Sequence, residues 1–271
     1  MINMAIMTMV QAINATLKQE MERDDAVIVL GEDVGRDGGV FRVTDGLIDI
    51  FGPDRLIDTP LSELGIVGTS IGLALGGMKP IAEIQFDGFV YSSLDQIISH
   101  MSRIRNRSRG RYKCPMVLRF PYGGGIKAIE HHSEAMEALF AHIPGIKVVI
   151  PSTPYDAKGL LTSAIRDSDP VIFMEPKRVY RSIKEDVPEN DYTIEIGKAS
   201  VRKEGNDVTL IAWGSMVKTA LETVEKINDV GVEVIDLRLI ISMINLINNT
   251  SVAIIVPKKI SVVIRLPSLV I

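Results

Sequence analysis

Glu63 is the residue whose type and position most directly suggest chemistry. It stands near the start of an apolar, glycine-spaced segment, DTPLSELGIVGTSIGLALGG, residues 58–77. A carboxylate entering an apolar region is costly unless it has a partner, which can be a protein group or a ligand. The pattern leaves both open. Thr59 could cap a helix that begins at Pro60, since an acid in the first turn is favoured by the helix dipole.

Three other stretches contain reactive or charged side chains. The pair His131 and His132 has no third ligand at a useful spacing for a metal, but it suits proton transfer near neutral pH. The basic run RIRNRSRGRYK, residues 103–113, could bind phosphate, or it could be a helix end facing solvent or another subunit. The PYGGG turn lacks the spacing of a dinucleotide or Walker motif, so it is a weak phosphate signal.

The elements that must position these residues alternate between helix and strand. Apolar residues recur at spacings of three and four from Ile6 to Met21, and the patterns of 63–76, 91–109 and 154–167 also predict helices. Five short apolar runs predict buried strands: AVIVLGED, PIAEIQF, MVLRF, KVVIP and VIFME. Such alternation is typical of an α/β domain with a largely parallel sheet.

A polar link, RSIKEDVPENDY, separates a second βαβ pattern from the first. We therefore expect one domain over residues 1–180, a linker over 181–192, a second α/β domain over 193–239 and a divergent tail over 240–271. No acidic residue follows Asp236, and the tail is rich in Ile, Val and Asn. A truncated or frameshifted reading frame would explain this, as would a genuine short variant of the domain.

Composition excludes several broad classes. The net charge of −4 gives no reason to expect nucleic acid or a membrane as the main partner. Cys114 is the single cysteine, which excludes an internal disulfide and fits a reducing compartment. The amino terminus has the pattern of a helix rather than of a signal peptide, and no apolar run has the length of a membrane span. We expect a cytoplasmic protein.

Long motifs in sequence order make the chain resemble a known family. They are GEDVGRDGGVFRVTDGL, DTPLSELGIVG, PIAEIQFDGFVYSSLDQI, HHSEAMEALFAHIPGIKVVIPSTPYDAKGLL and SDPVIFMEPKRVYR. The chain resembles, from about residue 4 to 239, the beta subunit of the decarboxylating component of 2-oxo acid dehydrogenases. The resemblance implies a transketolase-like pyrimidine-binding domain with a parallel sheet flanked by helices, followed by an incomplete transketolase C-terminal α/β domain. EIQFDGF and HIPGIKVVIP look nearer to the branched-chain than to the pyruvate enzyme.

The resemblance implies roles for individual residues. Glu63 matches the glutamate that hydrogen-bonds N1′ of the thiamine diphosphate pyrimidine, where burial would help the carboxyl share a proton. Phe89 matches the aromatic residue that stacks on this ring, and His132 matches the histidine that assists acyl transfer to the lipoyl group. A potassium site built largely from backbone carbonyls maps to Met116, Ala164, Ile165, Asp167 and Asp169.

The sequence contains no GDG motif, with which thiamine diphosphate enzymes hold the diphosphate through Mg²⁺. The resemblance therefore implies an alpha subunit that supplies this half of the site and holds Mg²⁺, in an α2β2 heterotetramer that also meets a lipoyl acyltransferase core. The chain alone would be inactive, poorly soluble and weak in binding that core. Alternatives are a pyruvate or acetoin dehydrogenase beta subunit and a non-catalytic assembly protein.

Overall fold

The computed structural model describes residues 3–240 and 261–262, and its centre is a seven-stranded sheet. The strand order is β12-β6-β7-β5-β4-β2-β3, parallel throughout except for the antiparallel edge strand β12. The strands are β2 (Val27–Gly31), β3 (Leu56–Asp58), β4 (Lys79–Glu83), β5 (Val117–Tyr122), β6 (Lys147–Val149), β7 (Val171–Pro176) and β12 (Leu239–Ile240). The five predicted strands all form.

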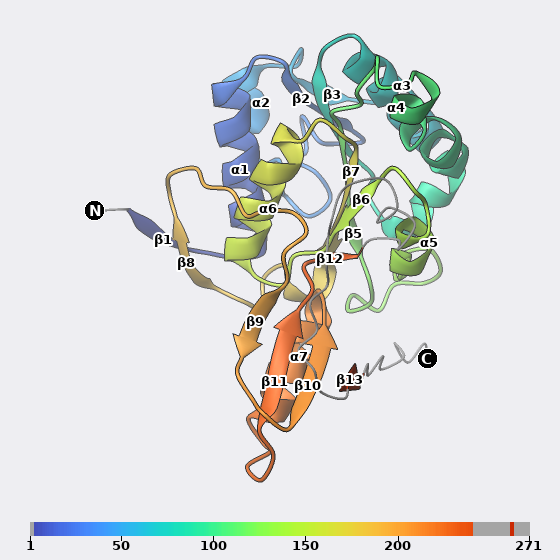
Figure 1. Cartoon of the computed structure of the whole chain (residues 1–271). Coiled ribbons are helices and arrows are strands. Elements are labelled where there is room, and N and C mark those ends of the chain that lie inside the picture. The colour runs from blue at the N-terminus through green and yellow to red at the C-terminus, as the bar shows by residue number, and fades with distance from the viewer. Residues whose placement is uncertain (1–2, 241–260, 263–271) are drawn as a thin grey trace.

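Helices cover both faces of this sheet, which gives three layers (Figure 1). Alternate residues of β7 enter the two cores: Val171 and Phe173 face α1 and α6, whereas Ile172 and Met174 face the opposite side. This explains why the strand is apolar throughout, as expected for a parallel sheet covered twice. The helices of this unit are α1 (Met9–Arg23), α2 (Leu47–Phe51), α3 (Glu63–Leu75), α4 (Ile104–Arg107), α5 (Glu137–Ala141) and α6 (Pro154–Arg166).

Local sequence accounts for the starts of the two helices on the first face. Thr8 caps α1 in a capping box with Gln11, so that side chains satisfy amides at the helix start. Thr153 caps α6, and Pro154 occupies its first turn, where a missing N–H costs nothing. The predicted capped helix is confirmed here.

The segment predicted to be helical over residues 91–109 is helical over most of its length, but it is not one continuous α-helix. The chain instead forms the 3-10 helix η1 (Asp87–Ser93), the π-helical turn η2 (Gln96–Met101) and the short helix α4. The Ser102 carbonyl lies so close to Gly145 that a Cβ there would be 2.1 Å from it. The Ser102 hydroxyl also donates to the Ile98 carbonyl. Tertiary packing and side-chain competition for the backbone therefore override the helical periodicity.

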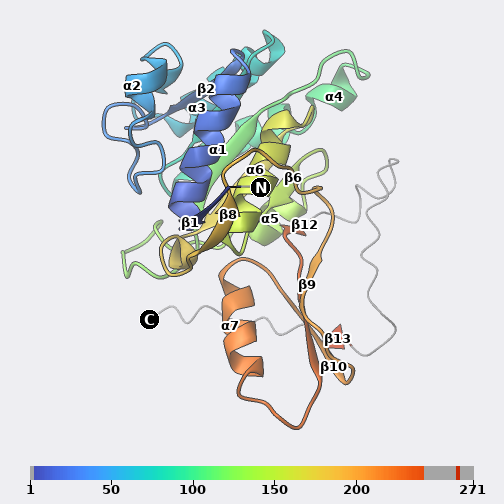
Figure 2. The ribbon, with the colours of Figure 1, turned by 90° about the vertical axis from the view of Figure 1, so that its left-hand side faces the viewer.

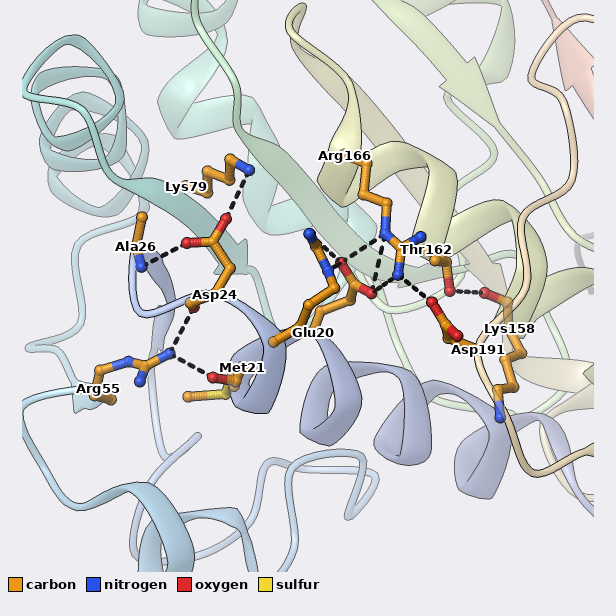
Figure 3. Close-up of polar contacts among 11 residues, drawn as sticks. Glu20, Met21, Asp24, Ala26, Arg55, Lys79, Lys158, Thr162, Arg166 and Asp191 are labelled. Carbon is orange, nitrogen blue, oxygen red and sulfur yellow. Dashed lines mark hydrogen bonds and ion pairs between the residues drawn. The ribbon is translucent and has the colours of Figure 1, made fainter.

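A buried carboxylate joins the two helices of the first face to the linker (Figure 3). Glu20 of α1 is fully buried and accepts hydrogen bonds from Arg166 of α6 and from Arg23. Arg166 also pairs with Asp191 at 2.6 Å, which holds the linker against α6. The linker contains strand β8 (Glu185–Pro188), which pairs antiparallel with β1 (Met4–Met7).

The second unit is a smaller sheet in the order β13-β10-β11-β9, with one helix packed on it (Figure 2). Its elements are β9 (Ser200–Lys203), β10 (Val208–Ala212), α7 (Ser215–Val224), β11 (Val232–Asp236) and β13 (Ser261–Val262). The strands β9 and β10 flank the connection over residues 204–207 but do not pair with each other, because β11 lies between them. Apart from residues 240, 261 and 262, the tail predicted over 240–271 lies outside the described residues.

Two aspartates and two arginines join the units. Asp156 at the start of α6 and Asp236 at the end of β11 are both fully buried. Arg202 of β9 pairs with both aspartates, and Arg238 pairs with Asp156 at 2.6 Å. Each buried carboxylate thus has a cationic partner, and the Arg202–Asp156 pair crosses the junction between the sheets. None of the described helices is both long and apolar enough to cross a membrane.

Candidate functional site

The candidate residues lie beyond the carboxyl ends of five parallel strands. Glu32 follows β2, Glu63 follows β3, Phe89 follows β4, His132 follows β5 and Lys177 follows β7. These strands are neighbours in the sheet, so their ends form one edge. Open α/β sheets bind ligands at this edge, because the loops that leave it diverge above the strands.

Glu63 is the first residue of α3 and is half-buried. The predicted cap at Thr59 is wrong: Ser62 caps the helix by accepting from the Gly65 amide at 3.3 Å. Ser92 of η1 donates a hydrogen bond to Glu63 Oε2 at 3.2 Å. The carboxylate is therefore oriented by a neighbouring element and keeps an oxygen to which no protein hydrogen bond is assigned within the described residues.

Glu32 is a second carboxylate at this site, for which the sequence predicted no role. It is 8% exposed, and its Oε1 is buried without a hydrogen-bond partner among the described residues. Burial raises the pKa of Glu32, and the negative charge of Glu63 raises that pKa further. An acid directly after the buried run VIVLG was the available signal. A pair of close carboxyl groups, one with a raised pKa, binds a proton more readily than an isolated carboxyl group.

Aromatic rings form the apolar part of the site. The ring of Phe89 lies 5.2 Å from the imidazole of His132 at 80°, and Phe86 lies 4.3 Å from the same imidazole. Phe86 and Phe89 contact each other edge to face at 5.6 Å. The structure thus brings the predicted residues Phe89 and His132 together. Their flat surfaces suit the packing of a planar heterocycle.

A buried ion pair lies against this aromatic cluster. Asp87 and the side chain of Lys177 are both fully buried, with 3.5 Å between Oδ1 and Nζ. Burial raises the pKa of Asp87 to about 6, although Lys177 opposes the shift. Burial also lowers the pKa of Lys177. The Lys177 ammonium lies 5.4 Å from the centre of the Phe86 ring, within the range of a cation–π contact.

Beneath the site, a second charged cluster spans three adjacent strands. Arg119 of β5 is fully buried and pairs with Glu83 of β4 and Glu175 of β7. The Tyr180 hydroxyl donates to Glu175. Burial raises the pKa of Glu83. Each of these charged groups has a protein partner, so we infer that the cluster stabilises the ends of the strands and does not bind a ligand.

The five positions predicted for potassium gather at the opposite, amino-terminal edge of the sheet. The Met116 carbonyl accepts from the Val171 amide at 3.0 Å, which places the start of β5 beside the start of β7, just after Asp169. The side chains of Asp167 and Asp169 already pair with Lys147 and Arg105. A cation here would depend on the remaining lone pairs of backbone carbonyls, since protein cations already neutralise the carboxylates. Within residues 3–240 and 261–262, no three His, Cys, Asp or Glu side chains converge as metal ligands.

The donor set fits the pyrimidine half of thiamine diphosphate. A heterocycle with ring nitrogens and an amino group needs a carboxyl partner, a second polar acceptor and an apolar face. Glu63, the unpartnered oxygen of Glu32 and the ring of Phe89 provide these three features at one sheet edge. The diphosphate would need cationic or metal ligands, and the described residues include no group of three His, Cys, Asp or Glu side chains that could hold the metal.

Two family models match the chain. The transketolase pyrimidine-binding domain matches residues 5–182, and the transketolase C-terminal domain matches residues 197–256. The second match extends beyond residue 239, where the sequence resemblance was expected to end. The expected transketolase-like α/β fold is confirmed.

Similar proteins carry two related names. The chain is 56% identical over 239 residues to the pyruvate dehydrogenase E1 component subunit beta of Acholeplasma laidlawii, covering 88% of this chain and 73% of the relative. It is 53% identical over 237 residues to the 2-oxoisovalerate dehydrogenase subunit beta of Bacillus subtilis strain 168, covering 87% and 72%. A solved split-gene transketolase, an inactive beta4 tetramer, shares the fold with a TM-score of 0.66 at 20% identity, covering 86% of this chain and 71% of that one.

Proposed function

The chain belongs to the E1 beta subunits of thiamine-diphosphate-dependent 2-oxo acid dehydrogenases, and from this premise we propose that it completes its active site with an alpha subunit. The reaction is oxidative decarboxylation of a 2-oxo acid with transfer of the acyl group to a lipoyl group of the acyltransferase core. One observation carries the proposal: Glu63, Phe89 and His132, far apart in sequence, follow β3, β4 and β5, parallel strands whose carboxyl ends lie at the same edge of the sheet.

Glu63 is the proton-handling group for the pyrimidine. Bound thiamine diphosphate supplies a nucleophilic carbon and a sink for the electrons released with CO₂. Glu63 holds a proton at pyrimidine N1′, and the hydrogen bond from Ser92 orients the carboxylate for this. Glu32 supports the protonated form of the pair, because two neighbouring carboxylates resist being charged together. Phe89 provides the apolar surface for the ring.

His132 acts where the acyl group leaves for the lipoyl sulfur. Its Nδ1 lies 2.9 Å from the Glu130 carbonyl, which favours a proton on Nδ1 and leaves Nε2 to face a reacting group. The loop position, half-exposed above the aromatic cluster, gives a lipoyl arm access from outside. An imidazole in this place can donate or accept the proton that thiol chemistry requires.

Two partners follow from the incomplete site. The alpha subunit supplies the diphosphate half and Mg²⁺, since this chain lacks the GDG motif. The assembly is an α2β2 heterotetramer that delivers acyl groups to the lipoyl acyltransferase core. Potassium binds through backbone carbonyls near Met116, Ala164, Ile165, Asp167 and Asp169. A higher melting temperature of the α–β complex in KCl than in NaCl would support that site, and equal values would remove it.

A branched-chain 2-oxo acid is the first substrate to test, on the basis of the EIQFDGF and HIPGIKVVIP motifs. Pyruvate is the second candidate, because the relative at 56% identity carries the pyruvate dehydrogenase name and the 2-oxoisovalerate relative is at 53%. The test is co-expression with an alpha subunit of the same enzyme family, followed by decarboxylation assays with 3-methyl-2-oxobutanoate and with pyruvate. Activity of the complex with one of them, and none from either chain alone, is expected. No decarboxylation of any 2-oxo acid by a cofactor-loaded complex would overturn the proposal.

A further inference from the structure

The loop that carries His132 has little regular structure of its own. Between the end of β5 and the start of α5, the residues from 124 to 131 are exposed, and His131 has a positive φ of 69°. A backbone hydrogen bond from the Gly123 amide to the Glu134 carbonyl, at 2.8 Å, closes the base of the loop, and contacts with the rest of the domain place the loop above the aromatic cluster. A reacting group on such a loop loses its geometry easily unless its ends are fixed.

One buried ion pair holds both ends of this loop. The Lys177 ammonium donates a hydrogen bond to the main-chain carbonyl of His132 at 2.7 Å. Asp87, the counter-ion of Lys177, accepts from the Gly123 amide at 3.1 Å with its other oxygen. Gly123 begins the loop and His132 lies near its end, so the ion pair adds to the direct hydrogen bond between Gly123 and Glu134 in holding the two ends of the loop together.

The neighbour of Asp87 is shaped to accept the loop. A Cβ on Gly88 would lie 2.3 Å from the His131 carbonyl oxygen, so only glycine allows this close approach of the two backbones. Lys177 also lies over Phe86, whose ring packs against the His132 imidazole at 4.3 Å. Lys177 therefore holds the main chain of His132 directly, and it contacts the Phe86 ring that packs against the His132 side chain.

The energetics favour a positioning role over a purely stabilising one. Removing two charges from water is costly, and well-packed apolar residues of similar volume are often at least as stabilising as a buried ion pair. An apolar pair could fill this space but could not bond to the His132 carbonyl and the Gly123 amide. The charges are useful because they fix two backbone groups of one loop.

We propose that Lys177 and Asp87 are positioning residues for His132, clasping the ends of its loop so that the imidazole is held for acyl transfer. The inference deepens the proposed function and rests on it. Neither residue needs to touch the reacting atoms. The clasp acts through the His132 carbonyl and the Gly123 amide, and its loss releases the loop while the rest of the sheet edge keeps its structure.

The test compares two reactions of the α–β complex. We expect Lys177→Met to lower acylation of an isolated lipoyl domain about 10- to 100-fold more than decarboxylation measured with an artificial electron acceptor. The double variant Asp87→Asn with Lys177→Met leaves no unpaired buried charge, so it should fold even if the single variant is unstable, and it should show the same bias.

A readout that does not depend on activity follows the loop itself. Lys127 is exposed within the loop, so trypsin cleavage after Lys127 should become at least several-fold faster in both variants. The matched control is Lys158→Met (Figure 3). Lys158 is also fully buried and donates to two carbonyls, those of Pro188 and Glu189, but it lies on α6. This control should lower stability without changing the ratio of the two reactions or the cleavage after Lys127.

The outcomes separate this inference from the proposed function. If the unaltered complex decarboxylates a 2-oxo acid while both Lys177 variants keep its ratio of acylation to decarboxylation and its resistance at Lys127, the clasp is wrong and the proposed function stands. If Lys158→Met produces the same bias, the effect reflects general destabilisation and the clasp is also wrong. A loaded complex with no decarboxylation would instead remove the proposed function.

Discussion

The hydroxyl of Ser92 donates a hydrogen bond to the carboxylate of Glu63 across 3.2 Å, joining η1 to the start of α3. Because η1 also carries Phe89, this contact ties the acid to the aromatic ring beside it. The protein therefore fixes the Glu63 carboxylate and the Phe89 ring relative to each other before the pyrimidine that both are proposed to contact is bound. Such preorganisation is what a proton-handling acid needs.

Replacing Glu32 with Gln tests the carboxylate pair. Because Glu32 is buried with an unpartnered oxygen and a raised pKa, Glu32→Gln should raise stability at neutral pH by roughly 0.5 to 2 kcal/mol while lowering activity. The measurement is thermal unfolding of the α–β complex without cofactor, beside a decarboxylation assay. A variant that is less stable and fully active would show that Glu32 is an ordinary structural acid.

His132→Ala should separate the two halves of the reaction. The imidazole lies in the loop beyond β5, where an incoming lipoyl group would reach it, so acylation of a lipoyl domain should fall by roughly 100-fold or more. Decarboxylation with an artificial acceptor should be affected less. Equal loss in both assays would remove the specific role in acyl transfer.

Asp87 gives the pair with Lys177 a pH signature. Since burial raises the Asp87 pKa from 3.8 to about 6, the folded protein binds a proton more tightly than the unfolded chain between these values. The contribution of this group to stability is thus largest at low pH and is lost as pH rises through about 6.

Comparison with Asp87→Asn isolates that contribution. The neighbouring charged groups Lys177 and Glu134 are present in both proteins. A change in their charge with pH therefore affects both melting temperatures. The melting temperature of the wild-type complex minus that of Asp87→Asn should be more positive at pH 5 than at pH 7. An identical difference at the two pH values would show that the Asp87 carboxyl is not perturbed.

The charged junction between the two sheets should be important for stability. Asp236→Asn leaves Arg202 with one fewer buried anion, and breaking such a pair costs about 3–5 kcal/mol. We expect a lower melting temperature and faster proteolysis in the linker over residues 181–192. Glu222→Gln, an exposed change on α7, is the control and should have little effect. Unchanged melting in both variants would contradict the assigned importance of the junction.

Much of the fold could be predicted because its signals are local. The apolar run of β7 and the capped start of α6 depend on neighbours within a few residues, and both were confirmed. The broken helix after Tyr91 could not be predicted, because its cause is the approach of Gly145 to Ser102. That contact joins segments far apart in sequence, and helical periodicity carries no information about it.

The residues of the candidate site also divide into those that could be predicted from sequence and those that could not. Glu63, Phe89 and His132 could be named because their motifs are continuous in sequence, and their roles stay predictions. Glu32 and Lys177 were missed because their significance comes from burial and from partners on other strands. Lys177 and the His132 carbonyl lie 45 residues apart in sequence and 2.7 Å apart in space. Only the parallel order of the strands brings them together.

The most direct test of the central claim is Glu63→Gln in the α–β complex, with thiamine diphosphate occupancy measured by titration. Gln keeps the shape and the acceptor for Ser92 but cannot supply a proton to pyrimidine N1′. We predict unchanged folding and assembly, retained cofactor binding and a loss of decarboxylation of roughly 100-fold or more. Glu22→Gln, an exposed change on α1, should leave activity unchanged. Near-normal turnover by a fully loaded Glu63→Gln complex would contradict the assignment of Glu63 as the acid of this active site.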